Sequence, residues 1–207
     1  MTQTATAPRT RIQREKREAI LEAALDVFSQ HGFRGATLDQ IADRAGLSKP
    51  NLLYYFEGKE AIHIQLLERL LEEWLDPLRA LDPDGDPRRE IRAYILRKLE
   101  MARDYPRESR LFANEIVQGA PRIGHVLEGP LKALVDSQAA ILRRWMAQGK
   151  IARIDPYHLI FAIWATTQHY ADFDVQVRAV LGDEGEGRFH DAAAFLETLF
   201  FRGLDPR

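Results

Sequence analysis

The sequence predicts an all-α protein with a small N-terminal helix-turn-helix domain and a larger helical domain behind it. Apolar residues recur at helical spacing through most of the chain. We find no alternating strand pattern and no Asn-Gly hairpin. Two short, capped helices joined by a glycine turn lie within residues 37–56. These observations together favour helix packing throughout.

Composition excludes several classes of protein. The chain has 207 residues, of which 45% are hydrophobic and 29% charged, as in ordinary globular proteins. It has no cysteine, which excludes disulfides, zinc-thiolate sites and cysteine nucleophiles. No apolar run approaches the ~18 residues of a membrane span. The first ten residues, MTQTATAPRT, lack the apolar core of a signal peptide. We therefore expect a cytoplasmic protein without membrane contact.

The distribution of charge is uneven. Formal net charge is −2, yet residues 9–17 contain five basic side chains and a single acid, Glu15. A basic arm on an acidic protein is expected when only one end contacts a polyanion. A solvated tail would have the same composition, so the arm alone leaves both interpretations open.

The first three helices have clear boundaries. A helix over residues 11–30 ends at His31-Gly32, because glycine accepts a left-handed conformation. Thr37 and Gln40 form a capping box that begins a second, short helix, which ends at Ala45-Gly46. Ser48 caps the third helix, with Pro50 in its first turn, where no backbone donor is lost.

The rest of the chain reads as longer helices. A break at Glu57-Gly58 precedes a helix over about 59–80, and residues 81–87 (LDPDGDP) form the best candidate linker. Tyr105-Pro106 and Asp155-Pro156 set two further boundaries. The expected helices are 88–104, 107–118, 122–149 with a break near Gly129-Pro130, 155–181 and 188–203.

Residues 37–56 predict a helix-turn-helix, whose second helix fits a major groove about 12 Å wide. Other helix corners share these parts, but the longer run Gly32 to Ile62 resembles the DNA-binding segment of the TetR family. It shares the Gly-aromatic pair, the I-A-x-x-A-G-L-S turn, the Tyr-Tyr-Phe end and the following x-Lys-Glu. The resemblance implies a DNA-binding domain over 1–57, with its basic arm at 1–17, and an effector-binding and dimerisation domain over 58–207. It also implies a homodimeric repressor of a palindromic double-stranded operator.

Residue type suggests how the DNA-binding domain over residues 1–57, called the head below, contacts DNA. Asn51 can pair with adenine, and Lys49 can reach guanine or a phosphate. By the resemblance, Thr37, the two tyrosines and Lys59 contact phosphates, so Lys59→Ala should reduce the salt slope by about one. Proline at position 50 and Leu53 depart from common family residues and leave base specificity open. The candidate DNA-binding residues are Arg11, Thr37, Ser48, Lys49, Pro50, Asn51, Tyr54, Tyr55 and Lys59. One of Tyr54 and Tyr55 can instead belong to the core.

The last two long helices predict a dimer face. The helix over 155–181 carries two apolar stripes, one with Ile160 and Ile163, the other with Phe161 and Phe173. A helix that is apolar nearly all round must be buried nearly all round. The helix over 188–203 repeats this pattern, and the family resemblance implies a four-helix interface between two copies.

Polar residues that interrupt these apolar faces predict a ligand pocket. Buried without partners, each would cost about 1–3 kcal/mol. Either they pair with one another or a ligand pairs with them. The candidate ligand-binding residues are Trp74, Phe112, Asn114, Glu115, Trp164, Thr167, Gln168 and Asp172.

Three segments of the predicted effector-binding domain narrow the range of candidate effectors. EEWLDPL, RDYPRESRLFANEIVQGAP and GKIARIDPYHLIFAIWATTQHYADFDVQV resemble pyrimidine-responsive regulators within the TetR family, which implies uracil or thymine as effector. The helix over 59–80 carries Trp74 and joins head to pocket, so we expect it to transmit the signal. A lipophilic drug or an acyl-CoA is the alternative effector, since the aromatic residues suit these ligands equally.

Two other classes of function deserve comparison. A helical enzyme could combine His169 and Asp172 with Glu115. However, the sequence has no E-x-x-H metal pair, Gly-rich phosphate loop or nucleophile elbow. We therefore expect no enzymatic activity, no cofactor and no metal site. A structural adaptor with a degenerate head is the remaining alternative.

Overall fold

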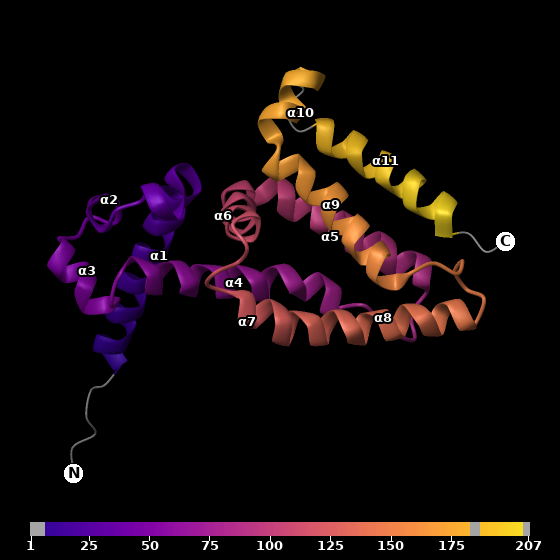
Figure 1. Cartoon of the computed structure of the whole chain (residues 1–207), viewed down its shortest axis with the longest axis horizontal. Coiled ribbons are helices and arrows are strands. Elements are labelled where there is room, and N and C mark those ends of the chain that lie inside the picture. The colour runs from indigo at the N-terminus through magenta and orange to yellow at the C-terminus, as the bar shows by residue number, and fades with distance from the viewer. Residues whose placement is uncertain (1–6, 183–186, 205–207) are drawn as a thin grey trace, which may run out of the picture.

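The computed structural model describes residues 7–182 and 187–204, and within these ranges every regular element is helical. Helices α1 (Ala7–Gly35), α2 (Leu38–Arg44) and α3 (Lys49–Tyr55) gather at one end of the molecule (Figure 1). Helix α4 (Lys59–Arg79) runs from this head into the body (Figure 1). The predicted all-α class is confirmed. Residues 1–6 of the predicted basic arm lie outside the described residues.

In the head, the predicted stop at Gly32 and the predicted caps at Thr37 and Ser48 are present, but α1 begins at Ala7 rather than at residue 11. Gly32 has a φ of 64° and interrupts α1 where the sequence predicts a stop, although one more turn reaches Gly35. The capping box is formed, since the Thr37 hydroxyl accepts from the Gln40 backbone N–H at 3.2 Å and the Gln40 amide oxygen accepts from the Thr37 N–H at 2.8 Å. Ser48 accepts from the backbone N–H of Asn51 and caps α3.

Helix α4 belongs to both packing units. Ile62, Leu66 and Leu67 from its first half join the apolar cluster of the head. Leu78 near its end joins the cluster of the body. The helix continues through Pro77. The predicted boundary between residues 57 and 58 thus falls at the start of α4, whereas the apolar core of the head continues along it.

The body consists of helices that pack around a second apolar cluster, which includes the almost fully buried Trp145, Ile95 and Leu196. The predicted break near Gly129-Pro130 is present as a π-helical segment, η1, between two α-helices. The body helices are α5 (Pro87–Asp104), α6 (Pro106–Val117), α7 (Gly124–Val126), η1 (Leu127–Leu131), α8 (Lys132–Ala147), α9 (Pro156–Asp172), α10 (Asp174–Leu181) and α11 (Gly187–Leu204).

One predicted helix is wrong. Residues 155–181 form two helices, because Phe173 leaves the helical region at φ −113° and ψ 28°. No glycine or proline marks the break. Instead, Asp172 is bound by Ser109 of α6, and Asp174 is bound by Arg188 of α11 at 2.9 Å. These contacts hold consecutive turns against different partners, which local periodicity cannot reveal.

Candidate functional site

Helix α3 presents an open outer face. Leu52 is buried and fixes the helix against the head, whereas Lys49, Pro50 and Asn51 are exposed. Tyr54 is 71% exposed, which excludes it from the core, and Tyr55 is half-buried. The residues predicted to meet base edges therefore share one accessible surface at the leading end of α3.

Internal contacts involve several predicted DNA-binding residues. Lys49 pairs with Asp39 at 2.9 Å, and Arg11 pairs with Glu15 at 2.8 Å, both on the surface. The partly buried ammonium of Lys59 donates to the carbonyls of Phe33 and Ala36, each at 2.7 Å. Lys59 thus closes the loop between α1 and α2, and its phosphate contact stays a prediction.

Arg17 is a head residue that sequence reasoning assigned only to the basic arm. Its guanidinium donates to the Tyr55 carbonyl and to the Gln65 side chain, each at 2.7 Å, and lies over the Phe56 ring. It therefore joins α1 to the end of α3 and to α4. The signal that could have separated it from the other basic residues is its helical spacing with buried Ile20 and Leu21.

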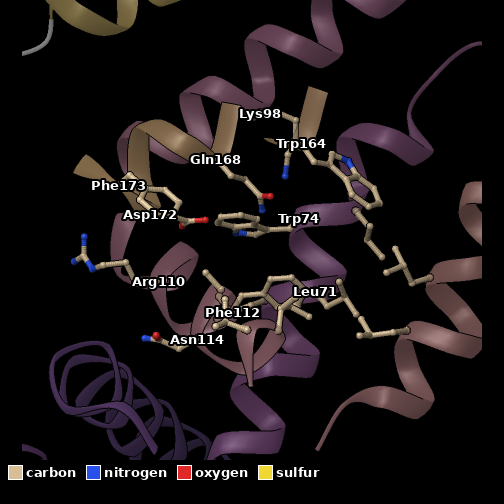
Figure 2. A pocket seen from close by; sticks show the side chains of 17 residues that line it. Leu71, Trp74, Lys98, Arg110, Phe112, Asn114, Trp164, Gln168, Asp172 and Phe173 are labelled. Carbon is tan, nitrogen blue, oxygen red and sulfur yellow. The ribbon is translucent and has the colours of Figure 1, made fainter. Parts of the chain in front are cut away.

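A cavity of about 650 Å³ lies in the body, between α4, α5, α6, η1 and α9 (Figure 2). Its volume is in the ~300–1,000 Å³ range of small-molecule sites. Mostly apolar side chains form the wall, with a few polar groups among them. Six of the predicted ligand-binding residues line it: Trp74, Phe112, Asn114, Trp164, Gln168 and Asp172.

Glu115 and Thr167 do not line this cavity, in contrast to the prediction. Glu115 is 2% exposed and accepts hydrogen bonds from the backbone N–H and the guanidinium of Arg122, at 2.8 and 2.9 Å. The Thr167 hydroxyl donates to the Ile163 carbonyl at 2.7 Å, within its own helix. Both polar groups are satisfied inside the protein.

Lys98, Arg110 and Phe173 line the cavity but were missed. The Lys98 side chain is almost fully buried, and its ammonium lies 4.4 Å from the centre of the Trp74 ring. Burial lowers the pKa of Lys98 to about 8, although Asp172 opposes this shift. Lys98 falls on the apolar stripe of residues 91, 94, 95 and 99, so a lysine inside an apolar stripe was the available signal.

The polar groups of the cavity differ in whether they have hydrogen-bond partners within the protein. The indole N–H of Trp164 donates to the Tyr94 hydroxyl at 2.5 Å, so its ring, rather than its donor, is offered to a ligand. Burial raises the pKa of Asp172, and Ser109 donates to its carboxylate. Among the described residues, the side-chain amides of the half-buried Gln168 and the exposed Asn114 have no hydrogen-bond partner. These amides are free to recognise a ligand that offers both donors and acceptors.

Neither a metal cluster nor a membrane-spanning helix is found where the structure is described. Over residues 7–182 and 187–204, no group of His, Asp and Glu side chains could hold a metal ion. In the same ranges, no helix is both long and apolar enough to cross a bilayer. The two features that the described residues offer are the exposed outer face of α3 and the partly open cavity in the body.

An exposed, capped helix-turn-helix joined to a ligand cavity in a helical body defines a helix-turn-helix DNA-binding regulator. The chain belongs to the TetR family. Residues 20–66 match the family described as bacterial regulatory proteins, tetR family, and residues 67–207 match the C-terminal region of the YcdC-like protein. It is a transcriptional regulator and not an enzyme.

Known relatives support this assignment along the whole chain. It is 50% identical to the HTH-type transcriptional regulator RutR of Escherichia coli K12, over 98% of this chain and 96% of RutR. A shorter match, 38% identical over 39% of this chain and 37% of the relative, is the HTH-type transcriptional activator FasR of Mycolicibacterium smegmatis.

Solved structures show the same fold. The putative regulator SCO4942 of Streptomyces coelicolor superposes with a TM-score of 0.75 at 23% identity, over 93% of this chain and 99% of that one. AibR, solved with isovaleryl coenzyme A and operator DNA, superposes with a TM-score of 0.73 at 17% identity, over 89% and 97%.

Proposed function

We propose that the chain is a repressor that binds a palindromic operator as a homodimer and releases it when uracil or thymine fills the cavity. The three body segments that resemble pyrimidine-responsive regulators of the family support the pyrimidine effector, and the chain is 50% identical to RutR over 98% of its length. The observation that carries the proposal is the cavity itself, where aromatic rings lie beside amides without protein partners.

A pyrimidine dione is flat and carries N–H donors and carbonyl acceptors around its edge. In Figure 2 the Trp74 ring lies between the polar groups of Lys98 and Gln168 and the side chains of Phe112 and Leu71. The pyrimidine ring can stack on an aromatic face such as that of Trp74, while the Gln168 amide supplies one donor and one acceptor. The Lys98 ammonium can donate to a carbonyl, and the Asp172 carboxylate can accept from a ring N–H.

The head supports operator binding through its exposed α3 face. Two copies of α3 must lie about 34–36 Å apart to enter successive major grooves. Exposed apolar residues on α9 and α11 are suited to hold two copies together, since Phe161 is 47% and Phe195 59% exposed in the isolated chain. A ligand that favours a different head spacing lowers operator affinity, and DNA lowers ligand affinity by the same factor.

Calorimetric titration of uracil, with and without operator duplex, tests the proposal. We expect weaker uracil binding in the presence of operator; equal affinities would remove the coupling. The cavity volume also admits a larger lipophilic effector, so a thermal-shift series compares uracil, thymine and a hydrophobic dye. Stabilisation by the dye alone would favour that alternative.

Gln168→Leu tests the pyrimidine site directly. It removes the free amide while keeping side-chain volume, so uracil affinity should fall about 5- to 150-fold, the equivalent of a lost polar contact of about 1–3 kcal/mol. Gln118→Leu, an exposed glutamine at the end of α6 outside the cavity wall, is the matched control. Unchanged uracil affinity in Gln168→Leu would place the ligand elsewhere.

Operator binding is tested by its salt dependence. Log affinity should fall steeply with log salt concentration, because phosphate contacts release counterions. Lys49→Ala and Lys59→Ala are compared, and the slope should shrink by about one for each lysine that binds a phosphate. A salt-independent association would contradict phosphate anchoring.

A further inference from the structure

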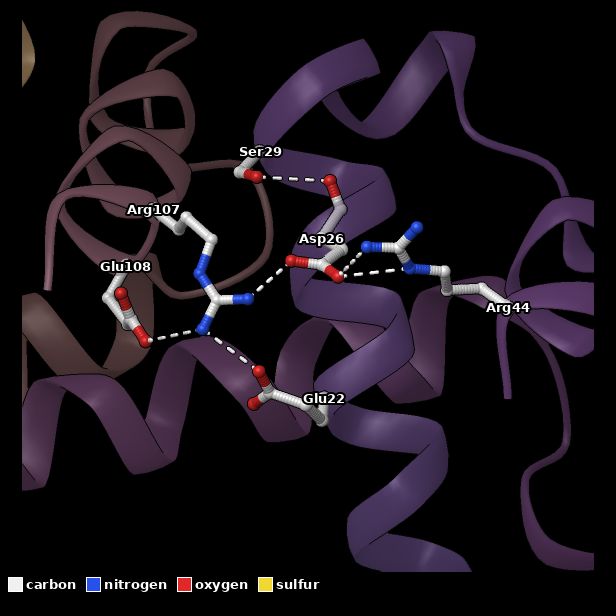
Figure 3. Close-up of polar contacts among 6 residues, drawn as sticks. All are labelled: Glu22, Asp26, Ser29, Arg44, Arg107 and Glu108. Atoms are coloured by element: carbon white, nitrogen blue, oxygen red, sulfur yellow. Dashed lines mark hydrogen bonds and ion pairs between the residues drawn. The ribbon is translucent and has the colours of Figure 1, made fainter. Parts of the chain in front are cut away.

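One carboxylate on α1 is shared by two arginines from different parts of the molecule (Figure 3). Asp26 accepts at Oδ2 from Arg44, at 2.6 Å from Nη2 and 3.1 Å from Nε. Its other oxygen, Oδ1, accepts from Nη1 of Arg107. Arg44 lies at the end of α2, the first helix of the helix-turn-helix, and Arg107 lies at the start of α6.

Two further carboxylates hold the Arg107 guanidinium beside Asp26. Nη2 of Arg107 donates to Glu22 at 2.9 Å and lies 3.7 Å from Glu108 (Figure 3). The Asp26 side chain is only 17% exposed. Burial raises its pKa, but the bonds from Arg44 and Arg107 outweigh burial and leave the pKa below its usual range. Asp26 is therefore ionised at neutral pH and holds both arginines at once.

Helix α6 faces the cavity and the head at the same time. Arg110 and Phe112 line the cavity, whereas Leu111 is buried in the apolar cluster of the head. Arg107 is one turn before Arg110 on this helix. A ligand that displaces the cavity face of α6 would therefore also shift the backbone that carries Arg107, whose guanidinium Asp26 binds.

We propose that Asp26 couples the two sites, so that movement of α6 on ligand binding reaches the helix-turn-helix through the Arg107–Asp26–Arg44 bridge. This inference rests on the proposed ligand response. Apolar contacts along α4 also join head and body, but they are non-directional. The hydrogen bonds of the bridge depend on orientation. When Arg107 moves away, the Asp26 carboxylate can rotate and its bond to Arg44 weakens. Helix α2, which positions α3, is then held less firmly.

Asp26→Asn tests the bridge, because it keeps the side-chain shape and removes the charge. Operator affinity is measured with and without saturating uracil, together with uracil affinity in the absence of DNA. Coupling factors are typically about 5- to 150-fold, and we expect Asp26→Asn to reduce the wild-type factor to about a third or less. Uracil affinity without DNA should stay within about twofold, since Asp26 does not line the cavity.

Glu18→Gln is the matched control. Glu18 is also on α1, but its partner is Arg69 of α4 at 2.5 Å, so its loss removes an ion pair without touching α6. This variant should keep the wild-type coupling factor. If Asp26→Asn does not fold, Arg107→Gln, which leaves the Asp26–Arg44 pair in place, decides the question.

The outcomes separate the two proposals. Uracil that binds the wild type without changing operator affinity, or does not bind at all, contradicts the proposed function and this inference with it. Wild-type coupling that persists unchanged in Asp26→Asn, or in Arg107→Gln, overturns the bridge alone. Non-additive effects of Arg44→Gln and Arg107→Gln on the coupling factor would support a shared carboxylate.

Discussion

His63 is a buried histidine at the junction of head and body. Its ring packs edge-on against Phe28 and Phe33, with centroids 4.7 and 4.9 Å away. Burial, assisted by the charges of Arg122 and Lys59, lowers its pKa from an ordinary 6.5 to about 4. At neutral pH the folded protein therefore holds His63 uncharged.

This pKa shift predicts acid sensitivity. Between pH 6.5 and pH 4 this histidine is protonated in the unfolded chain but not in the folded protein. The free energy of unfolding therefore falls as pH falls. We expect His63 to account for a loss of about 2 kcal/mol in the free energy of unfolding between pH 7.5 and pH 5. Urea denaturation at both pH values should show a smaller loss in His63→Leu.

His125→Leu is the control for this measurement, because His125 is exposed on α7. It should lose as much stability on acidification as the wild type does. An equal loss in the wild type and in His63→Leu would show that the buried ring is not the group responsible.

At the residue scale, the sequence located cavity-lining residues where a residue type was unusual for its stripe, whereas their contacts with a ligand stay a prediction. Trp74 stands among leucines on one stripe of α4, Gln168 follows the apolar run of α9, and both line the cavity. Thr167 stands next to Gln168 in sequence, yet about 100° of helical rotation turns it into the core. Which of two adjacent polar residues faces a cavity depends on how helices pack, and the sequence alone does not specify that.

At the scale of elements, the turn between α2 and α3 depends on one glycine. Gly46 has a φ of 65°, and a Cβ added there would meet no atom within 4 Å. Gly46→Ala should therefore cost about 1–2 kcal/mol through backbone strain alone. We expect a melting temperature lower by a few degrees and weaker operator binding, measured by calorimetry and gel shift.

Gly58→Ala gives the matched comparison. Gly58 also has no neighbour within 4 Å of an added Cβ, but its backbone is extended, with φ 165°. Alanine should be tolerated there with little change in melting temperature. Similar destabilisation by both substitutions would mean that backbone strain is not what distinguishes Gly46.

Elements were predicted well where local chemistry defines an end. Thr37, Ser48 and Gly46 mark their boundaries with hydroxyl caps or a left-handed backbone, and the structure confirms all three. The break at Phe173 has no such marker, because Ser109 and Arg188 impose it from other helices. Boundaries caused by tertiary contacts lie beyond the reach of periodicity.

At the scale of the whole molecule, α9 and α11 divide their apolar residues between two surfaces. Ile163 and Leu196 are buried in the core of the body. Phe195 and Leu199 of α11 are 59% and 48% exposed, and Phe161 of α9 is also exposed. The sequence indicated that these helices are apolar on more than one side; the structure separates the inner side from the outer one.

The exposed apolar residues of α9 and α11 predict the homodimer that operator binding requires. Phe195→Glu places a charge where we expect a second copy to pack, so the protein should elute as a monomer in size-exclusion chromatography with light scattering. A single head meets only one half-site, so operator affinity should fall by at least about 100-fold, while uracil binding to the separate cavity is retained. Ala140→Glu, at an exposed position on α8, should remain dimeric. A Phe195→Glu protein that is still a dimer, or a monomer that binds full operator at wild-type affinity, would contradict the two-fold arrangement of the heads.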